Sequence, residues 1–399
     1  MENPLPSDFK PPERGLVLWP VGTGDSITFV VDEDTIVQID LHHVKDAEDD
    51  EDPRMAIVDE LVAILPTRNG KPYLAAFGAT HLDDDHICGF KRLLEDEEVT
   101  IGDLWFTPRV LWDQDQHGLS DDAKAFRDEA ERRIEKLKGD ELLGSGDRIR
   151  IIGYHDSLEE HSEIYKNLPE KAVTVPGNEF TAIDGEDHDG TFRAFVHAPF
   201  KDDGDKDRND TSFALQVTLT DGDHDLKVLI LGDLAYPTVS RIFERSDAED
   251  LEFDVLIAPH HCSKSVMYWQ REGDSDVKLQ QALLDEIEKA ALQDAHILAS
   301  CGPIPASNSA GDNPPHAKAA ARYRELVDSG NFLCTGEHPT AEEPEPIVFS
   351  VDDEGVKLGA THVVAAAAAS SGVAKALDDA RGSTRPPAQP VGFGRPQGQ

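Results

Sequence analysis

Short apolar runs alternate with amphipathic segments along most of the chain, and glycine, proline or acidic residues separate them. Runs of this length predict buried β-strands, and apolar residues at helical spacing predict helices between them. The predicted strands lie within residues 16–31 (two strands), 35–41, 73–79, 101–107, 148–154, 191–200, 212–220, 227–233, 253–259, 296–301 and 346–351. The predicted helices lie within residues 55–65, 87–95, 121–138, 237–245, 277–292 and 315–327. Two meander-like halves with helices outside them indicate an α/β protein built as a four-layer αββα sandwich.

The organised part of the chain is expected to be one domain, residues 15–364. Residues 1–14 are rich in proline and polar residues, which indicates a loose N-terminal arm. We interpret an acidic, poorly periodic stretch at about 113–190 as an insertion in the domain. Residues 365–399 are rich in alanine, then in glycine and proline. Because that composition cannot bury a core, we expect a disordered tail.

Composition narrows the class of function. The 399 residues include 38 Lys and Arg against 79 Asp and Glu, a net charge of −41. A surface this acidic repels nucleic acid unless cations or a local basic patch intervene. The sequence has no apolar signal segment and no run of about 18 apolar residues, so a cytoplasmic protein without a membrane segment is expected. The four cysteines are scattered, without a CxxC pair, and predict no disulfide framework.

Ionisable side chains are concentrated at residues 80–86, between a predicted strand and a predicted helix. Residues two apart in an extended segment point the same way, so His81 and Asp83 can share one cation. Asp85 and His86 would then turn toward a second cation. Imidazole and carboxylate groups at this spacing suit zinc, manganese or iron. The alternative is an acidic helix N-cap with solvated histidines.

Further polar residues follow later strands, where α/β folds place their sites. Asp233 follows an apolar strand and could bridge two cations, or could be a turn aspartate. His197 also lies at the end of a strand, where it could be a metal ligand or a structural residue. The adjacent His260 and His261 follow another strand. His316 opens a helix, where it could meet an anion or lie on the surface.

Taken in order, these motifs resemble those of the metallo-β-lactamase superfamily, and more narrowly its competence-protein (ComEC-type) branch, as a soluble stand-alone domain. The matching motifs are VGTGDS at 21–26, ID at 39–40, HLDDDHI at 81–87, NDTS at 209–212, LGD at 231–233, PHHCS at 259–263 and NPPH at 313–316. Cys88 and Cys262 stand where the branch usually has glycine, either as small buried residues or as oxidation-sensitive thiols. The branch is typically joined to a membrane channel, and no such segment is present in this sequence, so its role in DNA uptake does not carry over.

The resemblance implies a metallo-β-lactamase sandwich that binds two divalent metal ions. Zinc is the expected metal, and manganese and iron are the alternatives. Its implied ligands are His81, Asp83 and His197 on one ion, Asp85, His86 and His260 on the other, and Asp233 between them. Whether His260 or His261 is the ligand stays open. A water activated by the two ions would be the nucleophile. The implied catalytic residues are Asp85, His261 and His316, and the implied substrate contacts are Ser263, Asn209 and Ser212.

The leading hypothesis is therefore a metal-dependent hydrolase, a phosphodiesterase or nuclease acting on a nucleic acid or nucleotide. A first alternative is hydrolysis of an ester, thioester or lactone, since one site serves many chemistries in this superfamily. A second is a metal-binding scaffold that meets a protein partner through the tail at 365–399.

Overall fold

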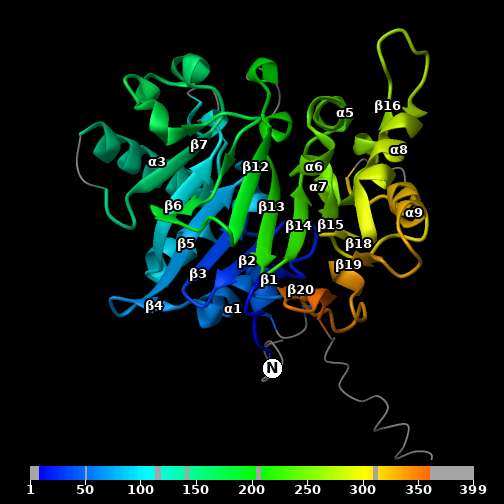
Figure 1. Cartoon of the computed structure of the whole chain (residues 1–399), viewed down its shortest axis with the longest axis horizontal. Helices are drawn as coiled ribbons and strands as arrows, with labels where there is room; N and C mark the ends of the chain where they lie inside the picture. The colour runs from blue at the N-terminus through cyan, green and yellow to red at the C-terminus, as the bar shows by residue number, and fades with distance from the viewer. Residues whose placement is uncertain are drawn as a thin grey trace, which may run out of the picture. The chain divides into compact units, whose positions relative to one another are not determined.

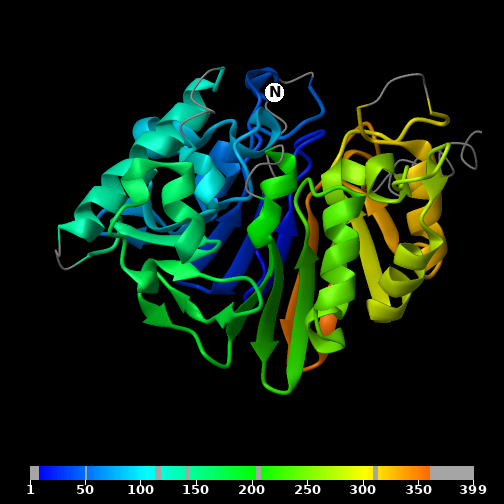
Figure 2. The same ribbon diagram turned by 90° about the horizontal axis from the view of Figure 1, so that it is seen from above.

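The computed structural model describes residues 9–49, 52–112, 118–139, 143–203, 208–308 and 313–359. Two β-sheets pack against each other, and helices cover their outer faces (Figures 1 and 2). The first sheet has the order β21-β20-β1-β2-β3-β5-β6-β7-β8, with β4 on β5. The second has the order β19-β18-β15-β14-β13-β12-β9.

The strands of the first sheet are β1 (Gly15–Leu18), β2 (Ile27–Asp32), β3 (Thr35–Ile39), β4 (Thr67–Arg68), β5 (Lys71–Ala79), β6 (Thr100–Phe106), β7 (Arg148–Ile152), β8 (Val173–Thr174), β20 (Ile347–Asp352) and β21 (Gly355–Leu358). Those of the second are β9 (Glu179–Phe180), β12 (Phe192–Ala198), β13 (Ala214–Asp221), β14 (His224–Ile230), β15 (Phe253–Ile257), β18 (Ala291–Ala299) and β19 (Phe332–Cys334). Two small ribbons pair β10 (Ala182–Ile183) with β11 (Glu186–Asp187), and β16 (Tyr268–Trp269) with β17 (Lys278–Leu279).

The helices are α1 (Ile57–Ile64), α2 (Asp84–Ile87), α3 (Asp121–Lys138), α4 (Leu158–His161), α5 (Tyr236–Arg245), α6 (Ala248–Leu251), α7 (Pro259–Cys262), α8 (Gln281–Ala290) and α9 (Ala317–Leu326). The apolar stripes of α1 and α3 bury residues such as Leu61 and Phe126 against the first sheet. Those of α5, α8 and α9 bury residues such as Ile242 and Ile287 against the second sheet. The central strands are therefore covered on both faces, which explains their nearly continuous apolar sequences.

A third core cluster fills the space between the sheets. It joins side chains of the first sheet, such as Phe29 and Val37, to side chains of the second, such as Leu215 and Val228. The three clusters separate helix, sheet, sheet and helix, so the predicted α/β class and four-layer order are confirmed. In the described part of the chain, no helix combines the length and the apolar content that a membrane crossing requires.

Some predicted segments differ in the structure. Much of the expected acidic insertion belongs to the sandwich, because α3 covers the first sheet, β7 and β8 extend it, and β9 joins the second. The helix predicted at 277–292 is shorter, since β17 precedes it and β18 begins at Ala291. Residues 9–14 are attached to the domain, with the Phe9 ring 5.9 Å from that of Trp19. The predicted tail at 365–399 lies outside the described residues.

The strand directions bring several polar residues to one edge of the sandwich. β3 and β5 run parallel in the first sheet, and β14, β15 and β18 run parallel in the second. The segments that follow these strands contain, in order, Asp40, Thr80, Asp233, His260 with His261, and Ser300. Because the carboxyl ends of parallel strands meet at one edge, this is where a site is expected.

Candidate metal centre

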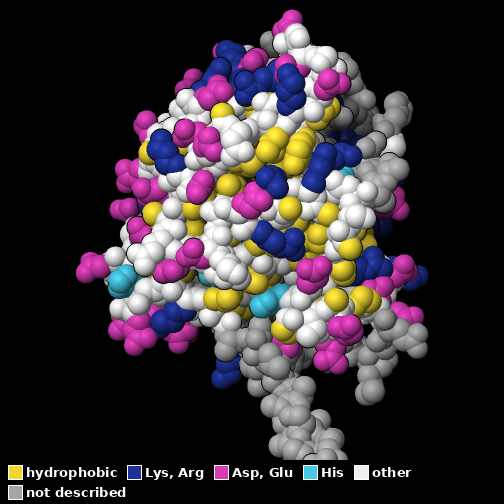
Figure 3. Space-filling view, turned by 90° about the vertical axis from the view of Figure 1, so that its right-hand side faces the viewer, with side chains coloured by type: hydrophobic (Ala, Val, Ile, Leu, Met, Phe, Trp, Pro, Cys, Tyr) yellow, Lys and Arg dark blue, Asp and Glu magenta, His cyan; other side chains and the backbone are white. Residues whose placement is uncertain are grey.

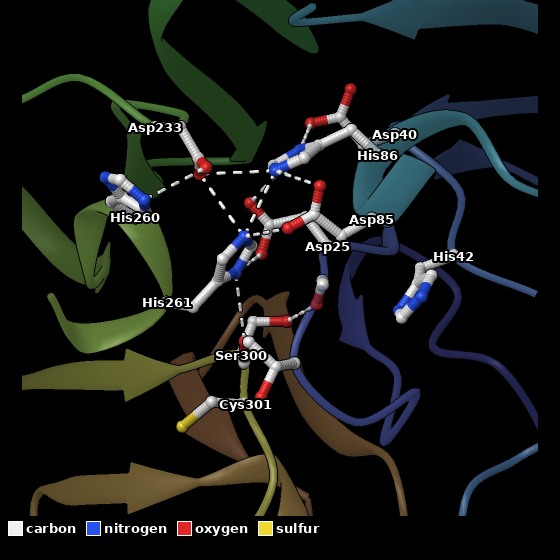
Figure 4. Close-up of polar contacts among 12 residues, drawn as sticks. Asp25, Asp40, His42, Asp85, His86, Asp233, His260, His261, Ser300 and Cys301 are labelled. Carbon is white, nitrogen blue, oxygen red and sulfur yellow. Dashed lines mark hydrogen bonds and ion pairs between the residues drawn. The ribbon is translucent and has the colours of Figure 1, made fainter. Parts of the chain in front are cut away.

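Asp233, His86 and His261 point toward one another at this edge (Figure 4). Asp233 Oδ1 lies 3.2 Å from His86 Nε2 and 3.3 Å from His261 Nε2. The two Nε2 atoms are 3.1 Å apart, and Asp85 Oδ2 lies 3.4 Å from His261 Nε2. These four side chains therefore bring imidazole nitrogens and carboxylate oxygens to one point between the two sheets.

The other oxygen of Asp233 faces a second group of side chains. Asp233 Oδ2 lies 3.6 Å from His260 Nε2 and 4.0 Å from His81 Nε2. His81 Nε2 is in turn 3.8 Å from Asp83 Oδ2. The two oxygens of one carboxylate thus divide the polar residues into two sets, which is the arrangement expected of a ligand shared by two cations.

The donor atoms fit divalent metal ions. His81 Nε2 is buried without a hydrogen-bond partner, and Asp233 Oδ1 accepts no well-aligned hydrogen bond. Buried polar atoms are ordinarily paired, so unpaired acceptors here are best explained by a cation that satisfies them. Imidazole with carboxylate is a donor set that suits zinc, manganese or iron. The donor atoms of Asp25, His86, His261 and Asp233, and those of His81, Asp85 and His86, lie close enough together to hold a cation. His260 faces the other oxygen of Asp233, and Asp83 faces His81 beside it.

Asp40 holds His86 in the orientation that a metal ligand needs. Its carboxylate is fully buried and accepts hydrogen bonds from Thr80 N and Thr80 Oγ1, each at 2.7 Å. His86 Nδ1 lies 2.8 Å from Asp40 Oδ2. A proton on Nδ1 donated to Asp40 leaves the lone pair of Nε2 for a cation. Asp40 appeared in the sequence only as a motif residue at a strand end, and that position was the signal for this role.

The Nδ1 atoms of His261 and His81 also have polar neighbours that orient the two rings. His261 Nδ1 lies 3.2 Å from Ser300 O and 3.5 Å from Asp25 Oδ1. His81 Nδ1 lies 3.3 Å from Ser212 Oγ. Ser212 is fully buried and donates to the backbone O of Asn209, so it orients His81 instead of facing a substrate as predicted.

The backbone conformation at α7 is unusual, and it explains how the adjacent His260 and His261 face different oxygens of Asp233. His260, His261 and Cys262 have φ values of 50°, 50° and 66°. Non-glycine residues rarely occupy this left-handed region, which costs on the order of 1–3 kcal/mol each, and such strain gathers at functional sites. The turn is tied to the second strand end by a hydrogen bond from His260 N to Gly232 O at 3.0 Å. We infer that the strain is retained because it directs both rings at Asp233.

The charges in the centre are strongly coupled. Burial lowers the pKa of His81 to about 3. Burial also acts to lower the pKa of His261, but Asp233 and Asp25 outweigh it and raise that pKa to about 10. Burial would raise the pKa of Asp233, yet His261 and His86 hold it well below its ordinary value. The centre therefore favours positive charge next to an ionised Asp233.

His197 is not brought to this centre. A β-bulge lies between Val196 and Ala198, and the ring of His197 packs 4.9 Å from that of Phe195. Its Nδ1 lies 2.8 Å from Ser246 Oγ, in a separate cavity beside α5. The side chain therefore points to the outer face of the second sheet, and burial lowers its pKa to about 4. His260 takes the place beside Asp233 Oδ2 that His197 was predicted to take.

The pairing of the adjacent histidines also differs from the prediction. His261, fully enclosed, lies with Asp85 and His86, where His260 was expected. Of the predicted substrate contacts, Asn209 Nδ2 lies 3.5 Å from Asp233 Oδ2, and Ser263 Oγ accepts from Ser265 N. His316 Nδ1 accepts from Lys264 N at 3.2 Å, which leaves its Nε2 as the protonated nitrogen.

Of the two cysteines beside the motifs, Cys88 is half-buried and Cys262 is buried, and neither is a reactive thiolate. Cys88 Sγ lies 2.8 Å from His43 O, and burial raises its pKa to about 11. Cys262 is fully buried, and burial raises its pKa to about 12. Because the thiolate is the reactive form, these pKa values favour the structural interpretation over an oxidation-sensitive site.

Comparison with solved structures finds proteins with related arrangements of strands and helices. YhfI from Bacillus subtilis, described as a metallo-β-lactamase fold protein, is 13% identical over 80% of this chain and 95% of its own, with a TM-score of 0.36. BJP-1, a subclass B3 metallo-β-lactamase of Bradyrhizobium japonicum, is 15% identical over 72% of this chain and 92% of its own, with a TM-score of 0.29. No family model and no curated protein matches the chain. These likenesses are weak, so the assignment of the site rests on its own geometry.

Proposed function

We propose that this protein is a hydrolase that uses two divalent metal ions, with zinc as the preferred metal. We propose further that it hydrolyses phosphodiester bonds. The observation that carries the proposal is the position of Asp233, whose oxygens face His86 and His261 on one side and His260 and His81 on the other. Two ions at such a centre would lower the pKa of a water molecule and neutralise the charge that develops in an in-line displacement.

Other residues of the chain would orient the metal ligands and the attacking water. Asp40 and Ser212 hold His86 and His81 in place, which preorganises the centre before a substrate arrives. Asp85 has a side chain that is 37% exposed. Burial acts to raise its pKa, but His261 and His86 outweigh it and lower that pKa, so Asp85 stays an ionised acceptor that can orient the attacking water.

On the face drawn in Figure 3, basic, acidic and hydrophobic side chains are interspersed, so this face is not a basic surface. The acidity of the chain does not exclude an anionic substrate, because two cations at the centre would supply positive charge locally. A neutral ester, thioester or lactone remains the alternative class of substrate.

Replacing Asp85 with alanine is expected to lower kcat for a phosphodiester by about a hundredfold or more, the usual effect of losing a positioned acid or base. The assay is hydrolysis of bis(4-nitrophenyl) phosphate, a cyclic nucleotide and single-stranded DNA, with and without a chelator. Asp84→Ala is the matched control, because the adjacent Asp84 is exposed and outside the centre. Activity that survives both chelation and Asp85→Ala would show that the chemistry lies elsewhere.

A further inference from the structure

A second cavity lies on the outer face of the second sheet. Its walls come from β12 and the loop after it, from the end of α5 with the start of α6, and from segments next to β7 and β9. None of the described residues that line it is an expected metal ligand. The cavity has a volume of about 340 Å³. Ligand pockets begin at about 300 Å³, so this one is large enough for a small molecule.

Aromatic rings form much of the wall. Phe195 and His197 are two residues apart on β12, so both point to the outer face, and their ring centroids are 4.9 Å apart. Tyr154 and Phe200 supply two further rings. The guanidinium of Arg241 already lies 4.2 Å from the ring centroid of Phe200, so we assign a ligand to the other three rings. Aromatic walls favour a planar ring, which can stack on them, over a branched aliphatic group.

His197 supplies the polar atom that points to a ligand. The residue is 3% exposed, and its Nδ1 lies 2.8 Å from Ser246 Oγ, another group of the cavity wall. Its Nε2 is buried and makes no well-aligned hydrogen bond to any residue that the structure describes. Buried polar atoms are ordinarily paired, because leaving one unpaired is costly. A ligand that forms a hydrogen bond with Nε2 would remove that cost.

The described lining favours a ligand without net charge. Burial lowers the pKa of His197 to about 4, so its imidazole is neutral near pH 7. Arg245 and Asp247 are both exposed, and Asp250 Oδ1 lies 3.4 Å from Arg193 Nη2. A charged ligand would therefore meet side chains of both signs, whereas a neutral one needs only stacking and one hydrogen bond.

We propose that this cavity binds an uncharged planar heteroaromatic ring of the size of a nucleobase, stacked on Phe195, His197 and Tyr154. The edge of such a ring carries hydrogen-bond donors and acceptors, one of which pairs with His197 Nε2. A small rotation of the lining side chains, of a kind that is common on binding, brings the ligand to this atom. The site is separate from the metal centre and does not depend on the proposed function.

The test titrates adenosine, and in a parallel series cyclohexanol, into the full chain by calorimetry. We expect adenosine to bind and cyclohexanol, which is neither planar nor aromatic, to bind at least about tenfold more weakly. Phe195→Ala should lower the affinity for adenosine about tenfold or more by removing a stacking ring. His197→Phe keeps a ring but removes Nε2, and should lower it about tenfold. His296→Phe is the matched control, because His296 packs 5.0 Å from the ring of Phe349 on β18, outside the cavity, and its affinity should not change.

The proposal is overturned if adenosine does not bind, if cyclohexanol binds equally well, or if the cavity variants bind adenosine as the control does. Circular dichroism checks that each variant is folded. If Phe195→Ala does not fold, Tyr154→Ala takes its place, because Tyr154 is only half-buried, and the same tenfold loss is expected. Adenosine contains no phosphodiester bond, so its binding is measured without turnover. A chain that binds adenosine here but hydrolyses no phosphodiester keeps the cavity and refutes the proposed function.

Discussion

Replacing Asp233 with asparagine is expected to deprive the protein of both metal ions and of its hydrolytic activity. The two carboxylate oxygens lie between two sets of histidines, and the amide of asparagine offers only one neutral oxygen. Removing one partner of a buried charge pair costs about 3 kcal/mol or more, so affinity should fall at least about a hundredfold at each position. Elemental analysis after dialysis should then find well under one ion per chain.

The control for this variant is Asp103→Asn, which changes another buried aspartate without touching the centre. Asp103 lies on β6, where burial raises its pKa, and it is 4% exposed. This control should keep its metal content. If Asp233→Asn kept one ion at full occupancy, Asp233 would serve only one position and would not be the shared ligand.

The second large effect is expected from Asp40→Asn. Asp40 has a φ of 55°, a conformation that asparagine tolerates, so the backbone should be preserved. The negative charge that fixes the proton of His86 on Nδ1 is lost, and partners of this kind are worth ten- to a hundredfold in metal affinity. Competition with a chromophoric chelator should show this loss at the position of His86, and a smaller loss at that of His81.

Asp184→Asn is a matched control for Asp40→Asn. Asp184 is also buried, has a φ of 46°, and accepts a hydrogen bond from Tyr73 Oη at 2.7 Å, away from the centre. The Asp184→Asn variant should therefore bind both metal ions with unchanged affinity. Equal effects of the two substitutions would mean that Asp40 acts on folding alone.

Periodicity and motif order were sufficient to predict the layers and the region of the site. The continuous apolar runs predicted strands buried on both faces, and the polar residues after β5, β14 and β15 do meet at one edge. The cluster at 80–86 predicted the centre because ionisable groups so close to a buried strand require partners.

The departures have different origins. His197 follows the inward-facing Val196, so alternation along β12 itself places its ring beside that of Phe195 on the outer face of the second sheet. Three consecutive left-handed residues decide which oxygen of Asp233 each of His260 and His261 faces. The pairing of Arg208 with Asp83 joins residues far apart in the sequence, so no local pattern could reveal it.

The most direct test of the two-ion centre is the number and position of metal ions in the full chain. Crystals of protein loaded with zinc should show two anomalous difference peaks, one on each side of the Asp233 carboxylate, and elemental analysis should find close to two ions per chain. A single fully occupied position, or none next to Asp233, would contradict the account.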